Sequence, residues 1–157
     1  MRVLIVAAGR LRTGPEAALV DDYLTRFGRT GAPLGLGPAE VAEIDDRSPA
    51  GMAARMSRAI PDAARLCVLD ERGRALTSPD FAGRLAGWRD DGARVAAFVI
   101  GGADGVEAGL RDRADLVLSF GPMVWPHLLA RVMLAEQLYR AATILSGHPY
   151  HRGGTGR

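Results

Sequence analysis

The sequence predicts an α/β fold whose sheet is mostly parallel, with helices on both of its faces. Short β-type apolar runs alternate repeatedly with helical patterns along the chain, which is the signature of a parallel sheet. The chain has 157 residues, a length typical of a single domain with one core. Hydrophobic residues make up 48% and charged residues 24%, as in a globular protein rather than a disordered one.

The first strand is predicted at Arg2–Ala8, where a β-rich apolar run ends at Gly9. Apolar residues at helical spacing then predict a helix over Glu16–Phe27. A stretch rich in glycine and proline, Gly31–Pro38, leads to a weak second strand at Val41–Ile44. These elements form the first strand–helix–strand unit.

The middle of the chain repeats this alternation. Ser48 and Pro49 supply a cap and a first-position proline, so a helix is predicted from there to about Ile60. A buried-type strand follows at Arg65–Asp70. Ser78-Pro79 repeats the helix start, and the apolar face of that helix carries Phe81, Leu85 and Trp88.

Two further strands and one long helix complete the predicted domain. The strands are Arg94–Ile100, which runs into a glycine-rich segment, and Leu116–Phe120. After Gly121-Pro122 the longest helical pattern covers about Pro126–Leu145. The whole chain, 1–157, is therefore predicted to be a single domain, with a mobile tail from about Gly153.

Composition excludes several chemistries. All cationic side chains are arginine, so a lysine Schiff base and a P-loop lysine are impossible. The single cysteine, Cys67, excludes an internal disulfide and any multi-cysteine zinc site. No apolar run approaches the ~18 residues that span a bilayer, and the first residues resemble a strand rather than a signal peptide. We expect a cytosolic protein that binds neither metal nor membrane.

The carboxyl ends of parallel strands are where α/β proteins bind ligands, and three loops leave the sheet there, after Asp70, Ile100 and Ser119. The second loop, Gly101–Gly105, allows close approach of a ligand to the backbone, although a tight turn explains it equally well. The third contains two prolines and a glycine. Its backbone could bind an adenine edge, or it could simply begin the last helix, with Trp125 in the core.

A cluster of His, Tyr and Arg side chains closes the sequence. Tyr150, His151 and Arg152 follow the last helix, which itself carries Arg140. These side chains suit stacking on a base, pairing with phosphate and moving a proton, whereas no cysteine or carboxylate lies nearby to support a metal. An ordinary polar tail is the alternative. Glu136 and Arg140 are spaced as a simple i,i+4 helix pair.

These loops, taken in order, resemble a known family. The motifs are Leu69-Asp70-Glu71-Arg72-Gly73, Ile100-Gly101-Gly102-Ala103-Asp104-Gly105, Leu118-Ser119, Met123 with Pro126-His127, Glu136-Gln137-Leu138-Tyr139-Arg140-Ala141 and His148-Pro149-Tyr150-His151-Arg152. They are similar, over essentially the whole chain, to the RlmH family of SPOUT-class methyltransferases. That family methylates N3 of a pseudouridine in bacterial large-subunit rRNA.

The resemblance implies a C-terminal trefoil knot, a homodimer, S-adenosylmethionine as cofactor and 23S rRNA in the ribosome as partner. Carried over by position, the cofactor contacts fall on Leu69, Gly101, Gly102, Phe120, Gly121, Pro122, Met123, Val124 and Trp125. The residues that act on the RNA side, counted here as catalytic, are Arg140, Tyr150, His151 and Arg152. We expect His151 to accept the N3 proton, with Asp104 as a weaker candidate.

This chain departs from the family pattern at Phe120-Gly121, Val124 and Trp125, which replace hydroxyl-bearing and leucine positions. Cofactor contacts through those hydroxyls are therefore lost, and we expect an altered affinity rather than an altered reaction. Two alternatives stay open at this point. One is a methyltransferase of the same class that acts on tRNA, and the other is a non-catalytic module that binds RNA or a nucleotide.

Overall fold

The computed structural model describes residues 1–45 and 47–154 of the chain, with side chains as far as residue 151 apart from residue 46. Its strands form one parallel five-stranded sheet in the order β2-β1-β4-β3-β5. The strands are β1 (Arg2–Ala8), β2 (Ala39–Ile44), β3 (Arg65–Ala75), β4 (Val95–Ile100) and β5 (Leu116–Ser119). The predicted α/β fold is confirmed.

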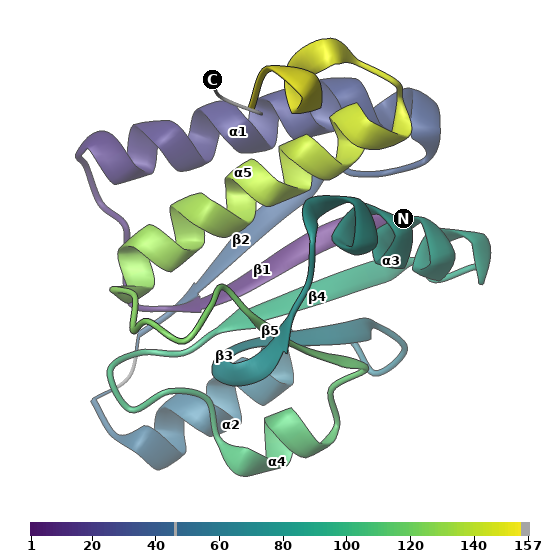
Figure 1. Cartoon of the computed structure of the whole chain (residues 1–157). Helices are drawn as coiled ribbons and strands as arrows, with labels where there is room; N and C mark the ends of the chain where they lie inside the picture. Colours follow the sequence, from purple (N-terminus) through teal and green to yellow (C-terminus); the bar gives the residue numbers. More distant parts are fainter. Residues whose placement is uncertain (46, 155–157) are drawn as a thin grey trace.

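Helices cover both faces of this sheet (Figure 1). One face carries α1 (Pro15–Gly31), α3 (Ser78–Asp90) and α5 (His127–Leu145), and the other carries α2 (Pro49–Ala59) and α4 (Ala108–Asp112). Two 3-10 turns, η1 (Ala32–Leu34) and η2 (Pro149–Gly154), complete the described chain. None of the described helices is long and apolar enough to cross a membrane.

The helix starts test the capping predictions directly. Ser48 caps α2 as predicted, since its hydroxyl accepts the backbone N–H of Gly51 at 3.1 Å. The prediction that Ser78 caps α3 is wrong. Thr77 is the cap and accepts the N–H of Asp80 at 3.2 Å, whereas the Ser78 hydroxyl donates to Gln137 on α5 at 2.8 Å.

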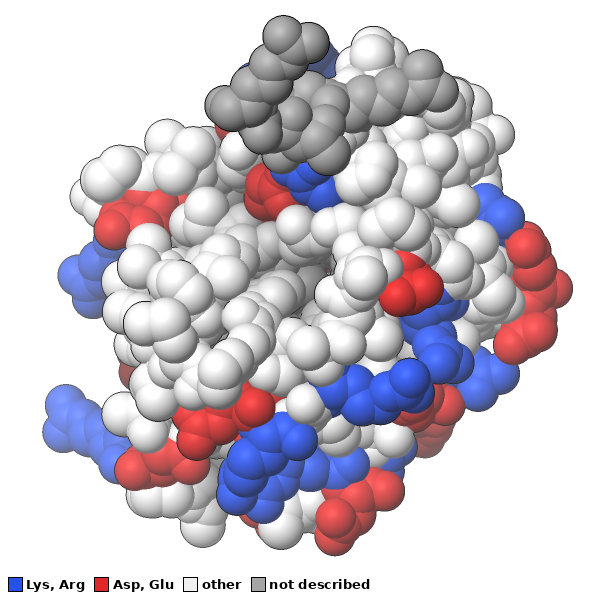
Figure 2. Space-filling model, viewed as in Figure 1, with Lys and Arg blue, Asp and Glu red and all other residues white. Residues whose placement is uncertain are grey.

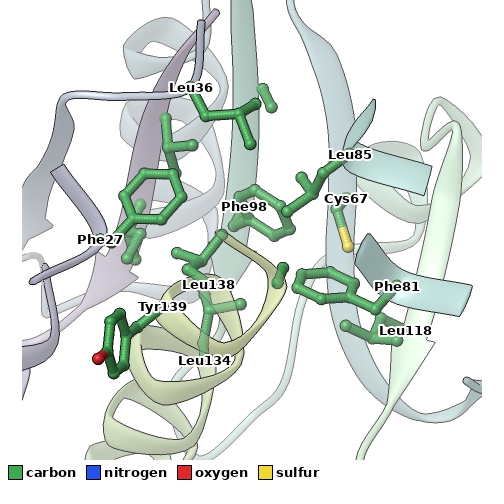
Figure 3. Close-up of a cluster of buried hydrophobic side chains, with 14 of the residues drawn as sticks. Phe27, Leu36, Cys67, Phe81, Leu85, Phe98, Leu118, Leu134, Leu138 and Tyr139 are labelled. Atoms are coloured by element: carbon green, nitrogen blue, oxygen red, sulfur yellow. The ribbon is translucent and has the colours of Figure 1, made fainter. Parts of the chain in front are cut away.

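The larger hydrophobic core lies between the sheet and the face that carries α1, α3 and α5 (Figure 3). Phe98 of β4 is fully buried there and meets Phe81 of α3 edge to face, with ring centroids 6.0 Å apart. Leu85 and Trp88 are buried on the same side of α3, as their spacing predicts. This packing fixes α5 between α1 and α3.

Strand β3 does not end where the sequence predicts, because it passes across β5 before it reaches α3. Residues Cys67–Leu69 pair with Leu116–Leu118, and after a register shift Arg74 and Ala75 pair with Leu118 and Ser119. Between these pairings Gly73 lies directly on the β5 backbone, where a Cβ would stand 2.6 Å from the carbonyl oxygen of Val117. This crossing, visible in Figure 1, is the feature that the implied knot requires.

A buried arginine anchors α5 to the carboxyl ends of β1 and β2. Arg131 is fully buried, and its guanidinium donates to the carbonyl oxygens of Ala8 and Gly9, each at 3.1 Å. It also pairs with Glu43 at 2.8 Å, and Glu43 in turn accepts the backbone N–H of Leu11. Because a buried cation needs such compensation, these contacts hold the start of α5 in one place.

Candidate active site

One cavity of about 770 Å³ lies at the carboxyl edge of the sheet, where β3, β4 and β5 end. The three loops selected from the sequence all line it, together with the first turn of α5. Its volume falls within the range of small-molecule sites. Its walls come from Leu69–Arg72, Ile100–Gly105, Leu118, Phe120, Gly121, Met123–His127 and Ala130.

The glycine-rich wall of the cavity is a folded turn. The N–H of Gly105 donates to the carbonyl of Gly102 at 3.0 Å, and Gly105 has a φ of 74°. A Cβ on Gly101 would collide with the carbonyl group of Gly105, whereas one on Gly102 would only touch Ala8 at 3.5 Å. Gly101 is therefore required by its own loop, whereas Gly102 could carry a Cβ in ordinary van der Waals contact with Ala8.

The wall that follows β5 is tied to the crossing segment of β3. The hydroxyl of Ser119 accepts the N–H of Gly121 at 3.0 Å and lies 3.1 Å from the carbonyl oxygen of Glu71. Gly121 has a φ of 109°, which disfavours any residue with a Cβ. Beyond it Met123 and Val124 are 69% and 80% exposed, so this wall is firm at its base and open at its tip.

A carboxylate within β3, at the register shift where the crossing segment begins, holds that segment against α4. The side chain of Asp70 is only 5% exposed and accepts hydrogen bonds from Arg72 at 2.9 Å and from Arg111 at 3.0 Å. The hydrogen bonds from Arg72 hold the pKa of Asp70 well below its usual range, although burial opposes them. The lowered pKa favours the ionised form of Asp70, which holds the crossing segment at the rim of the cavity.

The residues that the resemblance assigns to the cofactor come together in this cavity. Leu69, Gly101, Gly102, Phe120, Gly121, Met123, Val124 and Trp125 all line it, whereas Pro122 lies in the same segment without lining it. Asp70, Arg72 and His127 also line the cavity, although they were not among the predicted site residues. They lie within or directly beside the three predicted loops, and that position could have identified them.

The cluster of Arg140 and Tyr150 forms a separate group on the far half of α5. Glu136 accepts hydrogen bonds from Arg140, at 2.9 and 2.6 Å, and from the Tyr150 hydroxyl at 3.0 Å. The Arg140 guanidinium lies over the Tyr150 ring, 4.9 Å from its centroid, and the Tyr139 ring packs against it at 4.7 Å. Burial, reinforced by the Glu136 charge, raises the pKa of Tyr150.

His151 and Arg152 follow in η2. His151 is partly buried, and none of the described residues makes a hydrogen bond to its buried Nδ1 atom. The side chain of Arg152 and the tail predicted to be mobile, from Gly153 on, lie outside the part described with side chains. Tyr150 and His151 are neighbours in η2, and Tyr150 contacts Arg140 of α5, so η2 brings these residues to the far half of the helix.

This terminal cluster does not line the cavity. His127 and Ala130 line it, but between His127 and Arg140 the helix rises by about 20 Å at ~1.5 Å per residue. The cavity and the cluster therefore occupy opposite halves of α5. No three His, Cys, Asp or Glu side chains among the described residues lie close enough together to hold a metal ion.

An uncharged surface lies next to the cavity. Figure 2 shows a broad area free of charged side chains over the first half of α5 and the segment before it. The exposed large apolar residues include Met123, Val124 and Trp125 on that segment, Leu129 on α5 and Leu19 on α1. An exposed apolar area of this kind marks an interaction surface.

Comparison with known proteins identifies close relatives of the chain. The family model described as "Predicted SPOUT methyltransferase" matches residues 1–151. "Ribosomal RNA large subunit methyltransferase H" of Ruegeria pomeroyi is 66% identical, over 97% of this chain and 99% of that protein. The protein of the same name from Paracoccus denitrificans is 63% identical, again over 97% of this chain and 99% of its own length.

A solved structure supports the fold alone. A probable methylase family protein from Haemophilus influenzae superimposes with a TM-score of 0.51 at 12% identity. The match covers 94% of this chain and 69% of that chain. It agrees with the parallel sheet and its helical layers.

Proposed function

This chain belongs to the SPOUT methyltransferase family, among its ribosomal RNA large subunit methyltransferase H members, and we propose that it methylates N3 of a pseudouridine in 23S rRNA. S-adenosylmethionine is the methyl donor. The observation that carries the proposal is the single cavity of about 770 Å³ that the three strand-end loops share. The cellular location that follows from this substrate is the cytoplasm.

The cavity suits the cofactor by shape and by chemistry. Leu69, Ile100 and Phe120 offer apolar surface for an adenine and a ribose, and Gly101 and Gly102 add wall backbone that no side chain covers. We propose that Leu69, Gly101, Gly102 and the segment from Phe120 to Trp125 hold it, partly through backbone groups. The departures at Val124 and Trp125 change side chains only, so backbone contacts survive.

Methyl transfer to N3 needs alignment and the loss of one proton. The cofactor supplies a methyl group already activated on a sulfonium, so no metal is required. Fixing the base against the cavity wall removes much of the barrier, since positioning of this kind contributes about 7–11 kcal/mol. Trp125 and Phe120 line this wall and would pack against the bound cofactor.

The terminal cluster supplies the RNA side of the reaction in this proposal. His151 accepts the N3 proton, directly or through a water, because an imidazole nitrogen can act as a general base and its Nδ1 has no partner among the described residues. Arg140 and Arg152 hold a phosphate or a uracil oxygen, and Tyr150 stacks or positions the base.

A homodimer reconciles the two halves of the site. One chain separates its cavity from its terminal cluster along α5, so a cluster from the second copy must approach the cavity of the first. The uncharged surface around Met123, Trp125 and Leu129 is the face we propose for this contact. It adjoins the cavity, which places the second copy beside the cofactor.

Mass spectrometry of RNA from a strain that lacks the gene tests the function. We expect N3-methylpseudouridine to disappear from 23S rRNA and to return when the intact gene is supplied. Loss of a methylated nucleoside from tRNA instead would favour a tRNA methyltransferase. No change in either RNA, together with calorimetry that detects no S-adenosylmethionine binding, would favour a non-catalytic module.

A further inference from the structure

Glu136 stands at the centre of the terminal cluster, although its spacing alone suggests an ordinary helix pair. Its side chain is 18% exposed, and that of Arg140 is 19% exposed. One carboxylate oxygen, Oε1, accepts from Nε and Nη2 of Arg140 and from the hydroxyl of Tyr150. A solvated i,i+4 pair would need only the arginine, so the third contact gives Glu136 a further role.

The second carboxylate oxygen is engaged as well. Oε2 of Glu136 accepts from the side-chain amide of Gln137 at 2.7 Å, and the Gln137 oxygen accepts from the hydroxyl of Ser78 at 2.8 Å. Ser78 begins α3 directly after the crossing segment of β3. A continuous chain of hydrogen bonds therefore runs from the end of that segment to the terminal turn η2.

Glu136 occupies only one edge of the Arg140 guanidinium. Nε and the near side of Nη2 face the carboxylate, whereas the edge formed by Nη1 and the far side of Nη2 has no partner among the described residues. That edge keeps two parallel N–H groups, the geometry that matches a phosphate or a pair of oxygens. The aromatic ring of Tyr150, stacked under the guanidinium, removes the freedom to rotate.

We propose that Glu136 is a positioning residue for methyl transfer: it orients Arg140 toward the RNA and docks the turn that carries Tyr150 and His151. The inference rests on the proposed function, because it assigns Arg140, Tyr150 and His151 to the RNA side. Glu136 itself contacts neither the RNA nor the cofactor. The negative charge of Glu136 also weakens the overall attraction of this surface for phosphate. Glu136 therefore contributes to the orientation of Arg140 rather than to the affinity for RNA.

This role has a kinetic signature. Glu136→Gln removes the charge and leaves one amide oxygen in place of two carboxylate oxygens, so Arg140, Tyr150 and Gln137 can no longer all be satisfied. Turnover should fall by up to about 10²-fold, as misplacement of reacting groups does. KM for large ribosomal subunits should stay constant or decrease, since Arg140 is no longer neutralised. A residue needed only for folding would instead lower the melting temperature and the cofactor affinity.

Two companion variants sharpen the measurement. Tyr150→Phe removes the hydroxyl at the other end of the same hydrogen bond, so its effect on turnover should be less than additive with that of Glu136→Gln. Glu136→Asp keeps the charge but withdraws the carboxylate, and should also lower turnover. Asp62→Asn is the matched control, because it removes one exposed charge on a turn far from α5.

A second readout does not depend on RNA. In the free protein, Glu136→Gln should speed hydrogen exchange of the η2 amides at Tyr150 and His151, whereas Asp62→Asn should not. Unchanged exchange and unchanged turnover in Glu136→Gln, or full recovery in Glu136→Asp, would overturn the inference. If the wild-type protein transfers no methyl group to rRNA, the proposed function is wrong. Faster exchange in Glu136→Gln would then still show that Glu136 docks η2 against α5.

Discussion

The cavity and the terminal cluster lie on the same helix but are built from different groups. The cavity owes its shape to backbone: a crossing strand at Gly73, a turn at Gly101 and a positive φ at Gly121. The cluster owes its shape to side chains gathered on one carboxylate, that of Glu136. The first is fixed by topology and the second by a small hydrogen-bond network, so the two should respond differently to substitution.

The largest expected effect belongs to the cluster. His151→Ala should lower turnover by roughly 10²–10⁴-fold if the imidazole removes the N3 proton. The deficit should shrink as pH rises, because the imide then loses its proton unaided, and calorimetry should find the affinity for S-adenosylmethionine unchanged. A deficit that persists at high pH would make His151 a positioning residue and direct attention to Asp104.

The next effect belongs to the cavity. Gly101→Ala places a Cβ against the Gly105 carbonyl, so the loop must shift, and we expect the Kd for S-adenosylmethionine to rise about tenfold or more. Gly28→Ala, whose Cβ on α1 would meet nothing within 4 Å and lies away from the cavity lining, is the control. Equal affinities in the two variants would show that this wall does not contact the cofactor.

Mixing the Gly101→Ala and His151→Ala variants, at an S-adenosylmethionine concentration where each alone has little activity, tests whether the two regions meet across a dimer. A heterodimer of Gly101→Ala and His151→Ala subunits retains one intact cavity facing one intact cluster if each site uses both chains. Activity should therefore return on mixing after subunit exchange. If the cavity and the cluster act within one chain, the mixture stays inactive. A second copy is then not needed to complete the site, which contradicts the homodimer proposal.

A smaller effect is expected from substitution of Asp70 at the rim of the cavity. Asp70→Asn should lower the free energy of unfolding at neutral pH by about 1–2 kcal/mol, since hydrogen bonds to a charged group are lost and the guanidinium partners are partly solvated. The folded-state pKa of Asp70 is lowered, so its contribution is complete above the ordinary carboxyl pKa and declines as pH falls below it. Chemical denaturation at several pH values checks this: a difference between the two proteins that does not narrow in acid would contradict it.

The smallest effect is expected at the tail. Removing residues 153–157 should leave both cofactor affinity and turnover unchanged, because the residues that resemble the family end at Arg152. Steady-state kinetics on large ribosomal subunits measures this. A clear loss of activity would assign RNA contacts to the tail itself.

Sequence patterns predicted the elements well wherever periodicity carries the signal. Strand β1 has the predicted bounds because every residue after Arg2 is buried, and the face of α3 with Phe81 and Leu85 is buried as its spacing requires. The short helix α4 was not predicted, since five residues, Ala108–Asp112, are too few to show a helical period.

The crossing could not be derived from local patterns. Residues 71–75 read as a charged loop, and nothing in Glu71-Arg72-Gly73-Arg74 indicates that they pair with β5, a strand some forty positions later. The resemblance implied a C-terminal knot but did not indicate this strand pairing. The cluster was located by composition, but the contact from Glu136 to Tyr150 spans two elements, and spacing along one helix could not show it.

The double anchoring of α5 limits how this chain can change in length. Arg131 ties the first half of the helix to β1 and β2, and Glu136 ties the second half to η2. Inserting one residue between them would turn one half against the other by about 100°, which separates one set of partners whichever half stays in place. Insertions and deletions in α5 should therefore be rejected among relatives, whereas changes of length are admissible in surface connections such as the one before β2.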